Sequence, residues 1–202
     1  MNKKYIVYLF VLQLGILSGQ EYQAFYPQFY ANGNRLEMAT AGGLRNARFS
    51  NIDFNNDGVK DIYAFDKTSG RSLCFVNLNS SEGIEYRYAP EYEGIFPKIQ
   101  NWALLHDFNK DGVEDIFCLP STPGIPGIEV WRGKRQGNEL RFELMKSPFY
   151  DVISIPAGNG FTNLYNAITD VPAIIDVDGD GDTDVLSFEL DGSFLNYHQN
   201  RA

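Results

Sequence analysis

Short apolar runs separated by polar loops recur along this chain, and their length predicts β-strands. The runs at residues 47–52, 61–65 and 72–78 are typical, because they are short and rich in β-branched and aromatic side chains. Clusters of Asp, Asn, Gly and Ser bound them, as turns between strands require. No stretch shows sustained helical periodicity. The pattern predicts an all-β fold built from antiparallel sheets.

The pattern repeats three times, at about residues 35–95, 96–155 and 168–202. In each repeat two strands are joined by an acidic loop, and a turn and further strands follow. About four short strands in a repeat of this length is the arrangement of a β-propeller blade. We interpret residues 154–166 as an extra loop before the last repeat, which holds fewer strands. Three repeats are too few for a usual closed ring, so we expect an incomplete propeller, or a fragment of one, with exposed edge strands.

The three acidic loops place oxygen-bearing residues at the same positions. Each loop has Asp at positions 1, 5 and 9, Asn or Asp at position 3 and Gly at position 6. Ca²⁺ takes six to eight oxygen ligands at about 2.3–2.6 Å, and alternate side chains of a curled loop, with the backbone carbonyl of position 7, can supply them. Gly at position 6 permits the sharp turn. We therefore predict three calcium sites with the ligands Asp53, Asn55, Asp57, Val59 and Asp61; Asp107, Asn109, Asp111, Val113 and Asp115; and Asp176, Asp178, Asp180, Asp182 and Asp184.

The residues around the loops distinguish between calcium motifs. An EF-hand would need a bidentate Glu at position 12 and a following helix, whereas position 12 is Ala64, Cys118 or Ser187 and strand-like runs follow. Clusters of Asp, Asn and Gly are also common as ordinary solvated turns. Three clusters in the same register favour calcium over that alternative. The third loop has Asp178 where the others have Asn, so its higher ligand charge predicts the tightest site.

With its flanking strands, the first loop resembles the FG-GAP or VCBS-type repeat, over the stretch from Phe49 to Phe65. This family includes the propellers of integrin α-chains and many exported bacterial proteins. The resemblance extends over most of residues 35–202 and implies a β-propeller in which the calcium loop joins the first two strands of each blade. It further implies a secreted or cell-surface module, as in large bacterial surface proteins that carry type IX sorting domains. No such C-terminal domain is visible in the sequence.

The N-terminus has the pattern of a secretory signal peptide. Lys3 and Lys4 precede an apolar stretch at residues 5–17, and small residues follow it. The stretch is short for the roughly 20 residues that a bilayer span needs, and no later segment is suited to one. We therefore predict a signal peptide at residues 1–20, a propeller region at residues 21–202, and a secreted or cell-surface location.

The charge of the chain argues against a nucleic-acid-binding protein, and the placement of its cysteines bears on whether they form a disulfide. The formal charge of −9 lies largely in the loop aspartates, and there is no basic patch of the kind that nucleic acid requires. Cys74 and Cys118 lie in strand runs at different positions of their repeats. This placement favours two buried free thiols over a disulfide, although an exported protein can form one.

Two classes of function fit these features. The first is a non-catalytic, calcium-binding module for adhesion to an extracellular protein or glycan, or for contact with further propeller blades. The alternative is the propeller part of a secreted polysaccharide-degrading hydrolase or lyase. The fold alone does not choose between them. His106 and His198 are the two histidines of the chain, and no Ser/His/Asp arrangement stands out, so we expect no enzyme activity.

Candidates for sugar contacts lie outside the loops. A carboxylate pair for glycoside hydrolysis would have to come from Glu85, Glu91, Glu93 or Glu143. Aromatic rings that can stack on sugars are also present, although such residues in strands more often pack in the core. These aromatic residues are Tyr86, Tyr88, Tyr92, Trp131, Phe149 and Tyr150.

Overall fold

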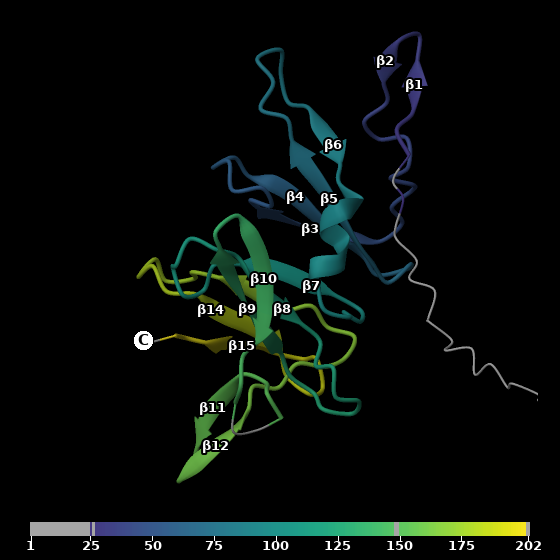
Figure 1. Cartoon of the computed structure of the whole chain (residues 1–202). Coiled ribbons are helices and arrows are strands. Elements are labelled where there is room, and N and C mark those ends of the chain that lie inside the picture. Colours follow the sequence, from purple (N-terminus) through teal and green to yellow (C-terminus); the bar gives the residue numbers. More distant parts are fainter. Residues whose placement is uncertain (1–24, 26, 148–149, 201–202) are drawn as a thin grey trace, which may run out of the picture.

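The computed structural model describes residues 25, 27–147 and 150–200. Within these residues the regular secondary structure is almost entirely β, and the strands form a row of antiparallel sheets that does not close into a ring (Figure 1). The all-β prediction is confirmed. No helix in this part of the chain is long and apolar enough to cross a membrane. The predicted signal peptide at residues 1–20 lies outside the described residues.

Four strands form the first blade, in the order β3-β4-β5-β6, with each strand antiparallel to the next. Their bounds are β3 (Ala47–Ile52), β4 (Asp61–Asp66), β5 (Arg71–Asn77) and β6 (Tyr86–Tyr88). β3 has the bounds predicted from its apolar run, and residues 67–70 form the turn between β4 and β5, in one of the polar clusters that the sequence predicts as turns. The first two strands meet at Ile52 and Asp61, which lie opposite each other in register.

The second blade repeats this arrangement, and the third has one strand fewer. In the second blade the order is β7-β8-β9-β10, with bounds β7 (Ala103–His106), β8 (Asp115–Cys118), β9 (Glu129–Gln136) and β10 (Glu139–Leu144). The third blade consists of β13 (Ala173–Ile175), β14 (Asp184–Phe188) and β15 (Leu195–His198). The expectation of four strands is thus met in the first two repeats. In the third, β15 is an edge strand within the described residues.

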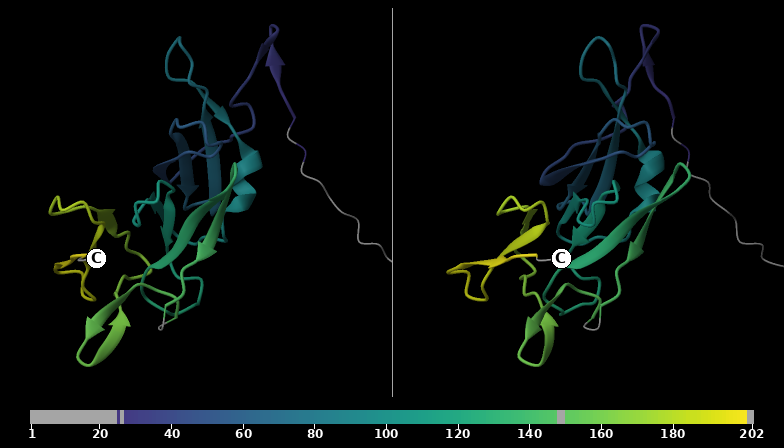
Figure 2. Two further views of the ribbon diagram at one scale, coloured as in Figure 1. Left: turned by 60° about the vertical axis from the view of Figure 1, so that its left-hand side comes forward. Right: turned by 90° about the vertical axis from the view of Figure 1, so that its left-hand side faces the viewer.

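The described residues also form two hairpins and one short 3-10 helix outside the blades. The hairpin of β1 (Tyr30–Ala31) and β2 (Asn34–Arg35) projects beyond the first blade (Figure 2). The helix η1 (Pro90–Ile95) follows the first blade. The hairpin of β11 (Ser154–Ala157) and β12 (Gly160–Asn163) lies between the second and third blades in the chain.

The hairpin of β11 and β12 corrects the interpretation of residues 154–166 as an extra loop. Ala157 pairs with Gly160, so two residues, Gly158 and Asn159, make the turn. Gly158 has φ 56°, in the left-handed region that two-residue hairpin turns require. The Gly-Asn pair was the sequence signal for this turn.

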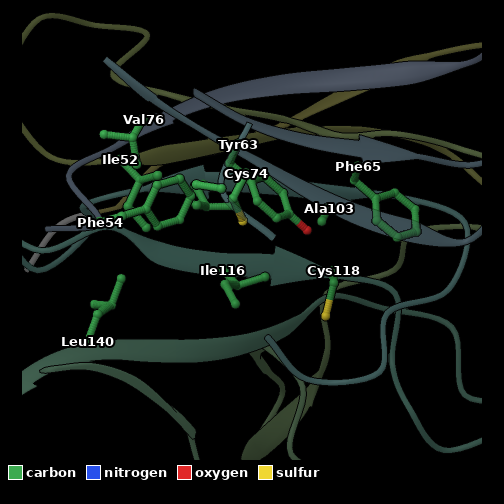
Figure 3. Close-up of a cluster of buried hydrophobic side chains, with 12 residues drawn as sticks. Ile52, Phe54, Tyr63, Phe65, Cys74, Val76, Ala103, Ile116, Cys118 and Leu140 are labelled. Atoms are coloured by element: carbon green, nitrogen blue, oxygen red, sulfur yellow. The ribbon is translucent and has the colours of Figure 1, made fainter. Parts of the chain in front are cut away.

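The first and second blades share a hydrophobic core. Ile52, Phe54 and Tyr63 of the first blade lie opposite Ile116 and Leu140 of the second (Figure 3). Each of these side chains is fully or almost fully buried. Burying one such side chain is worth about 1.5–3 kcal/mol, so the contact between blades contributes much of the stability of the fold.

A second core joins the second blade to the third and to the β11–β12 hairpin. Trp102, Phe117 and Val130 come from the second blade, Leu164 follows β12, and Val185 lies in β14. Trp102 is the largest fully buried side chain described. The two cores together fix the order of the three blades, and therefore the spacing of the acidic loops.

Both cysteines are buried free thiols. Cys74 lies in β5 and Cys118 at the end of β8, and both belong to the core between the first two blades. Burial raises the pKa of each thiol well above its usual value. They act as small apolar side chains, as their place in strand runs suggested.

Candidate metal sites

Each acidic loop joins the first two strands of a blade. Residues 53–60 connect β3 to β4, residues 107–114 connect β7 to β8, and residues 176–183 connect β13 to β14. The residue before each loop pairs with the aspartate at position 9, as Ile175 does with Asp184. The strand ladder therefore closes the loop at its base and brings positions 1 and 9 together.

The backbone turns sharply at two positions of every loop. The glycines at position 6 have φ of 83°, 89° and 93°, as the sequence predicted for Gly58, Gly112 and Gly181. Position 4 is also left-handed, which sequence reasoning missed. It is Asn56 (φ 63°), Lys110 (φ 57°) and Gly179 (φ 78°). Asn and Gly tolerate this conformation well, so two of the three residues carried a signal for it.

Hydrogen bonds to the backbone hold the carboxylates of positions 1 and 5. One oxygen of position 1 accepts the N–H of position 6, at 3.0 Å for Gly58 to Asp53, 2.9 Å for Gly112 to Asp107 and 2.9 Å for Gly181 to Asp176. One oxygen of position 5 accepts the N–H of position 7, at 2.8 Å for Val59 to Asp57, 3.0 Å for Val113 to Asp111 and 2.8 Å for Asp182 to Asp180. The three loops therefore share one conformation.

The aspartate at position 9 is fully buried in every loop and ties the loop to the rest of its blade. Its Oδ2 accepts the N–H of position 2, at 2.7 Å from Phe54 to Asp61, 3.2 Å from Phe108 to Asp115 and 3.0 Å from Val177 to Asp184. Its Oδ1 accepts an N–H in or just after the third strand, at 2.8 Å from each of Asn77, Gly133 and Asn200. Because a carboxylate oxygen has two lone pairs, these bonds leave capacity for a metal.

The surroundings of position 9 differ in their effect on its acidity. Burial raises the pKa of Asp115 to about 6 and raises that of Asp61 as well. The pKa of Asp184 is lowered, chiefly by the backbone N–H of Val177. A metal ligand must be deprotonated, so the third loop is the one best prepared for a cation.

The third loop brings its carboxylates together. Asp176, Asp178 and Asp184 each offer an oxygen, and these atoms lie within 4.8 Å of one another. Tyr197 donates its hydroxyl to Oδ2 of both Asp178 and Asp184, at 3.1 Å in each case. Gln199 Nε2 donates to Asp178 at 2.5 Å. These three carboxylates form a group that can bind a metal ion, and the sequence had not indicated the two donors.

The first and second loops do not form such a carboxylate group among the described residues. Their position 3 is an asparagine, and its amide nitrogen donates to position 5. The distances are 2.8 Å from Asn55 to Asp57 and 2.9 Å from Asn109 to Asp111. In these two loops the side chains of positions 3 and 5 lie next to each other. The asparagine presents its amide nitrogen, and not its oxygen, to the aspartate.

Cations from one blade reach the loop of another. Lys60 of the first loop pairs with Glu114 of the second, and Lys110 Nζ lies 2.8 Å from Asp182 Oδ1 of the third. The hydrogen bond to Asp182 raises the pKa of Lys110. The spacing of these residues in the sequence gave no sign of the pairs, because each joins different blades.

Arg135 of β9 provides a further link between blades. Its guanidinium donates to the backbone carbonyl of Asp53 and lies 3.8 Å from the carboxylate of that residue. The first loop therefore already has a cation beside its position 1. No equivalent contact to position 1 of the second or third loop is found among the described residues.

Both histidines lie in strands and contact residues of the neighbouring strand. His106 ends β7 and pairs in register with Asp115. His198 Nε2 lies 3.3 Å from Ser187 Oγ, and burial lowers the pKa of this histidine. The Ser187 side chain is buried, so its hydroxyl is not open to a substrate.

The glutamates outside the loops do not converge. Glu91 pairs with Arg87 at 2.7 Å, Glu93 accepts the hydroxyl of Tyr88 at 2.6 Å, and Glu143 pairs with Lys134 at 2.5 Å. Glu85 contributes its backbone carbonyl to Leu78. The described structure therefore gives each of these residues a different partner.

Three of the six candidate sugar-stacking rings pack against the protein itself. Tyr88 is buried, and Tyr92 stacks on Phe54 with ring centroids 5.1 Å apart. Trp131 packs on the first core and donates Nε1 to Glu129 at 2.6 Å. Tyr86 is half-buried and Tyr150 exposed, while Phe149 lies outside the described residues.

Comparison with known families bears on the segment that holds the second and third loops. Residues 107–187 match the FG-GAP-like repeat family. This segment is an FG-GAP-like repeat. The resemblance expected from the sequence is confirmed here, and the match runs from the first aspartate of the second loop into β14. No curated protein and no solved structure matched the chain.

Proposed function

We propose that the protein is an exported, calcium-stabilised β-propeller module with a non-catalytic role in binding or adhesion. The observation that carries the proposal is the recurrence of one loop conformation at the same place in three successive blades. The FG-GAP-like repeat supports a propeller-type module. The calcium sites and the adhesive role go beyond that comparison and rest on the chemistry of the loops.

The third loop fits a calcium ion best. Asp176, Asp178, Asp180 and Asp184 supply carboxylates, and the backbone carbonyl of Asp182 adds a neutral oxygen. Water would complete the six to eight ligands that Ca²⁺ takes. Tyr197 keeps two of the carboxylates oriented, so less order has to be imposed when the ion binds.

The first and second loops have the same backbone and a lower ligand charge. A half-turn of the Asn55 or Asn109 amide would present its oxygen to the ion in place of its nitrogen. Each of these loops then offers three carboxylates, against four in the third, and in the first loop Arg135 adds a repelling cation. We therefore propose that the third loop binds calcium most tightly and the first most weakly.

The contacts of the acidic side chains support a binding role. Most of the aspartates lie in the three acidic loops, and the glutamates considered for hydrolysis pair with separate partners. An extracellular protein, a glycan or further propeller blades are the partners we propose. No observation in the described structure favours a polysaccharide hydrolase or lyase.

Calorimetric titration of the purified protein with calcium, after treatment with chelator, tests the proposal. We expect three ions per chain for the wild type and two for each of Asp57→Ala, Asp111→Ala and Asp180→Ala. Asp170→Ala removes an aspartate outside the loops and serves as the control, with three ions retained. Unchanged stoichiometry in the three loop variants would contradict the assignment of ligands.

Export is tested separately. If the signal peptide is cleaved where the sequence predicts, the protein recovered outside the cell begins near residue 21. Retention of the intact N-terminus inside the cell would contradict the proposed location.

A further inference from the structure

Each blade has two faces, because successive side chains of a strand point to opposite sides of the sheet. We call the face that points toward the next blade the forward face. Counted from the first aspartate of the loop, it includes the residue before the loop and positions 2, 11 and 13. In the first blade these are Ile52, Phe54, Tyr63 and Phe65, and each is no more than 1% exposed.

The second blade uses the same positions against the third. Phe117 and Leu119 are buried in the second core, and Phe108 packs against it. His106, half-buried, is the exception in this set. The forward face of a blade is therefore the surface that the next blade covers, and its positions lie at fixed distances in sequence from the acidic loop.

The third blade presents the same face without a cover. Ile175, Val177, Leu186 and Phe188 occupy the four positions, and Leu186 pairs with Tyr197 and Phe188 with Leu195 across the sheet. Leu186 is half-buried, and the other five residues are between 44% and 55% exposed. Among the described residues, the third blade stands at the end of the row and no further sheet covers it (Figure 2). A contiguous apolar surface of this kind marks an interface.

The opposite end of the row carries a partly open backward face, the face that a blade turns toward the preceding one. In the first blade Phe49 and Ile62 belong to it, and Phe75 pairs with Ile62. The segment at Ala41 covers the neighbouring Ala64. Phe49 remains 62% exposed. The row of blades thus has an open forward face at the third blade and an exposed phenylalanine, Phe49, on the backward face of the first.

We propose that a second copy of this chain covers the forward face of the third blade with the backward face of its first blade. The contact continues the interface that already joins the first blade to the second and the second to the third. It is head-to-tail, so a second identical contact can close the pair. Two copies of three blades would give six, within the four to eight blades of known propellers.

This inference rests on the propeller part of the proposed function and does not depend on calcium.

Sedimentation velocity of the purified protein, from low to high micromolar concentration, measures the association. We expect a dimer for the wild type. Phe188→Glu on the forward face and Phe49→Glu on the backward face should each weaken association more than about tenfold, since each places a charge in a desolvated contact. Phe161→Glu is the matched control, because Phe161 is 56% exposed in β12 and lies on neither face.

A mixture of the two variants guards against misfolding as an explanation. In a mixed pair, the Phe49→Glu chain supplies an intact forward face and the Phe188→Glu chain an intact backward face, so one of the two contacts is restored. We expect the mixture to form more dimer than either variant alone.

Several results would overturn the inference. They are a monomeric wild type at high micromolar concentration, equal effects of Phe188→Glu and Phe161→Glu, or a mixture that stays monomeric. Calcium titration of the Phe188→Glu chain keeps the two proposals apart. A monomeric wild type that still binds three calcium ions contradicts only the second copy, whereas a dimer without calcium binding contradicts only the calcium sites.

Discussion

Gly133 in β9 lies against the backbone of the second loop, and replacing it with alanine should disturb both the blade and the loop. A Cβ at this position would overlap the carbonyl oxygen of Glu114 and lie 2.8 Å from Val113 Cγ1. The N–H of Gly133 donates to Asp115 Oδ1 at 2.8 Å. A side chain here therefore pushes apart the loop and the strand that its buried aspartate connects.

The cost can be worked from these contacts. Overpacking a well-packed site costs typically about 1–3 kcal/mol, and the overlap with backbone atoms cannot be relieved by a side-chain rotation. Loss of a hydrogen bond to a carboxylate costs a further 1.5–3 kcal/mol at most, roughly. The two effects share one displacement and do not add fully, so we expect Gly133→Ala to lower the free energy of unfolding by about 3 kcal/mol. For a chain of this size that corresponds to a melting temperature lower by about 6–12 °C.

Thermal melts in calcium, followed by circular dichroism, measure the effect. Gly160→Ala is the control, because Gly160 also lies in a strand but has nothing within 4 Å of an added Cβ. We expect the control to melt within about 2 °C of the wild type, as surface substitutions usually do. Equal melting temperatures for Gly133→Ala and Gly160→Ala would contradict the tight contact between β9 and the second loop.

Three further outcomes follow from the described contacts. Trp102→Ala should cost about 3–5 kcal/mol in denaturant unfolding, as a large fully buried side chain of the second core, and a loss below about 1 kcal/mol would contradict that placement. Cys74 and Cys118 should react with iodoacetamide only after unfolding, since both thiols are buried and their pKa is raised; rapid labelling of the folded protein would contradict this. Lys110→Met should tighten calcium binding by the third loop at low salt, because it removes the cation beside Asp182, and the gain should vanish at high salt; an equal gain at both salt concentrations would contradict the electrostatic origin.

The strands beside the loops could be predicted because their signals are local. β3 has the bounds of its apolar run at residues 47–52, and β4 extends one residue beyond its run at 61–65, since a β-branched or aromatic run and an adjoining polar residue define each end. The glycine at position 6 of the loops carried a similar local signal. The bounds of β5 are shifted by one residue from its predicted run at 72–78.

Contacts between blades were beyond the sequence. Lys60 and Glu114 are 54 positions apart, and Arg135 and Asp53 are 82 apart. No pattern in either stretch specifies which loop will face which strand. The role of position 9 in joining each loop to its third strand was missed for the same reason, because Asp115 and Gly133 meet only when β9 has paired with β8.

The sequence predicted ligands in three loops, and among the described residues the structure brings three carboxylates together in the third loop, at Asp176, Asp178 and Asp184. Alternating aspartates identified the loops, but the carboxylate group of the third loop depends on Tyr197, which lies on another strand. The amide orientations of Asn55 and Asn109 follow from hydrogen bonds within their loops. Neither feature is visible in the spacing of acidic residues.

The melting temperature of the purified protein in calcium and in chelator tests the central claim most directly. An ion that binds only the folded chain adds about 2.7 kcal/mol per site when its concentration is a hundred times Kd. We expect the protein to melt several degrees lower in chelator, with calcium restoring the higher value and magnesium at equal concentration restoring it less. An identical melting temperature in calcium and chelator would contradict the calcium-stabilised propeller.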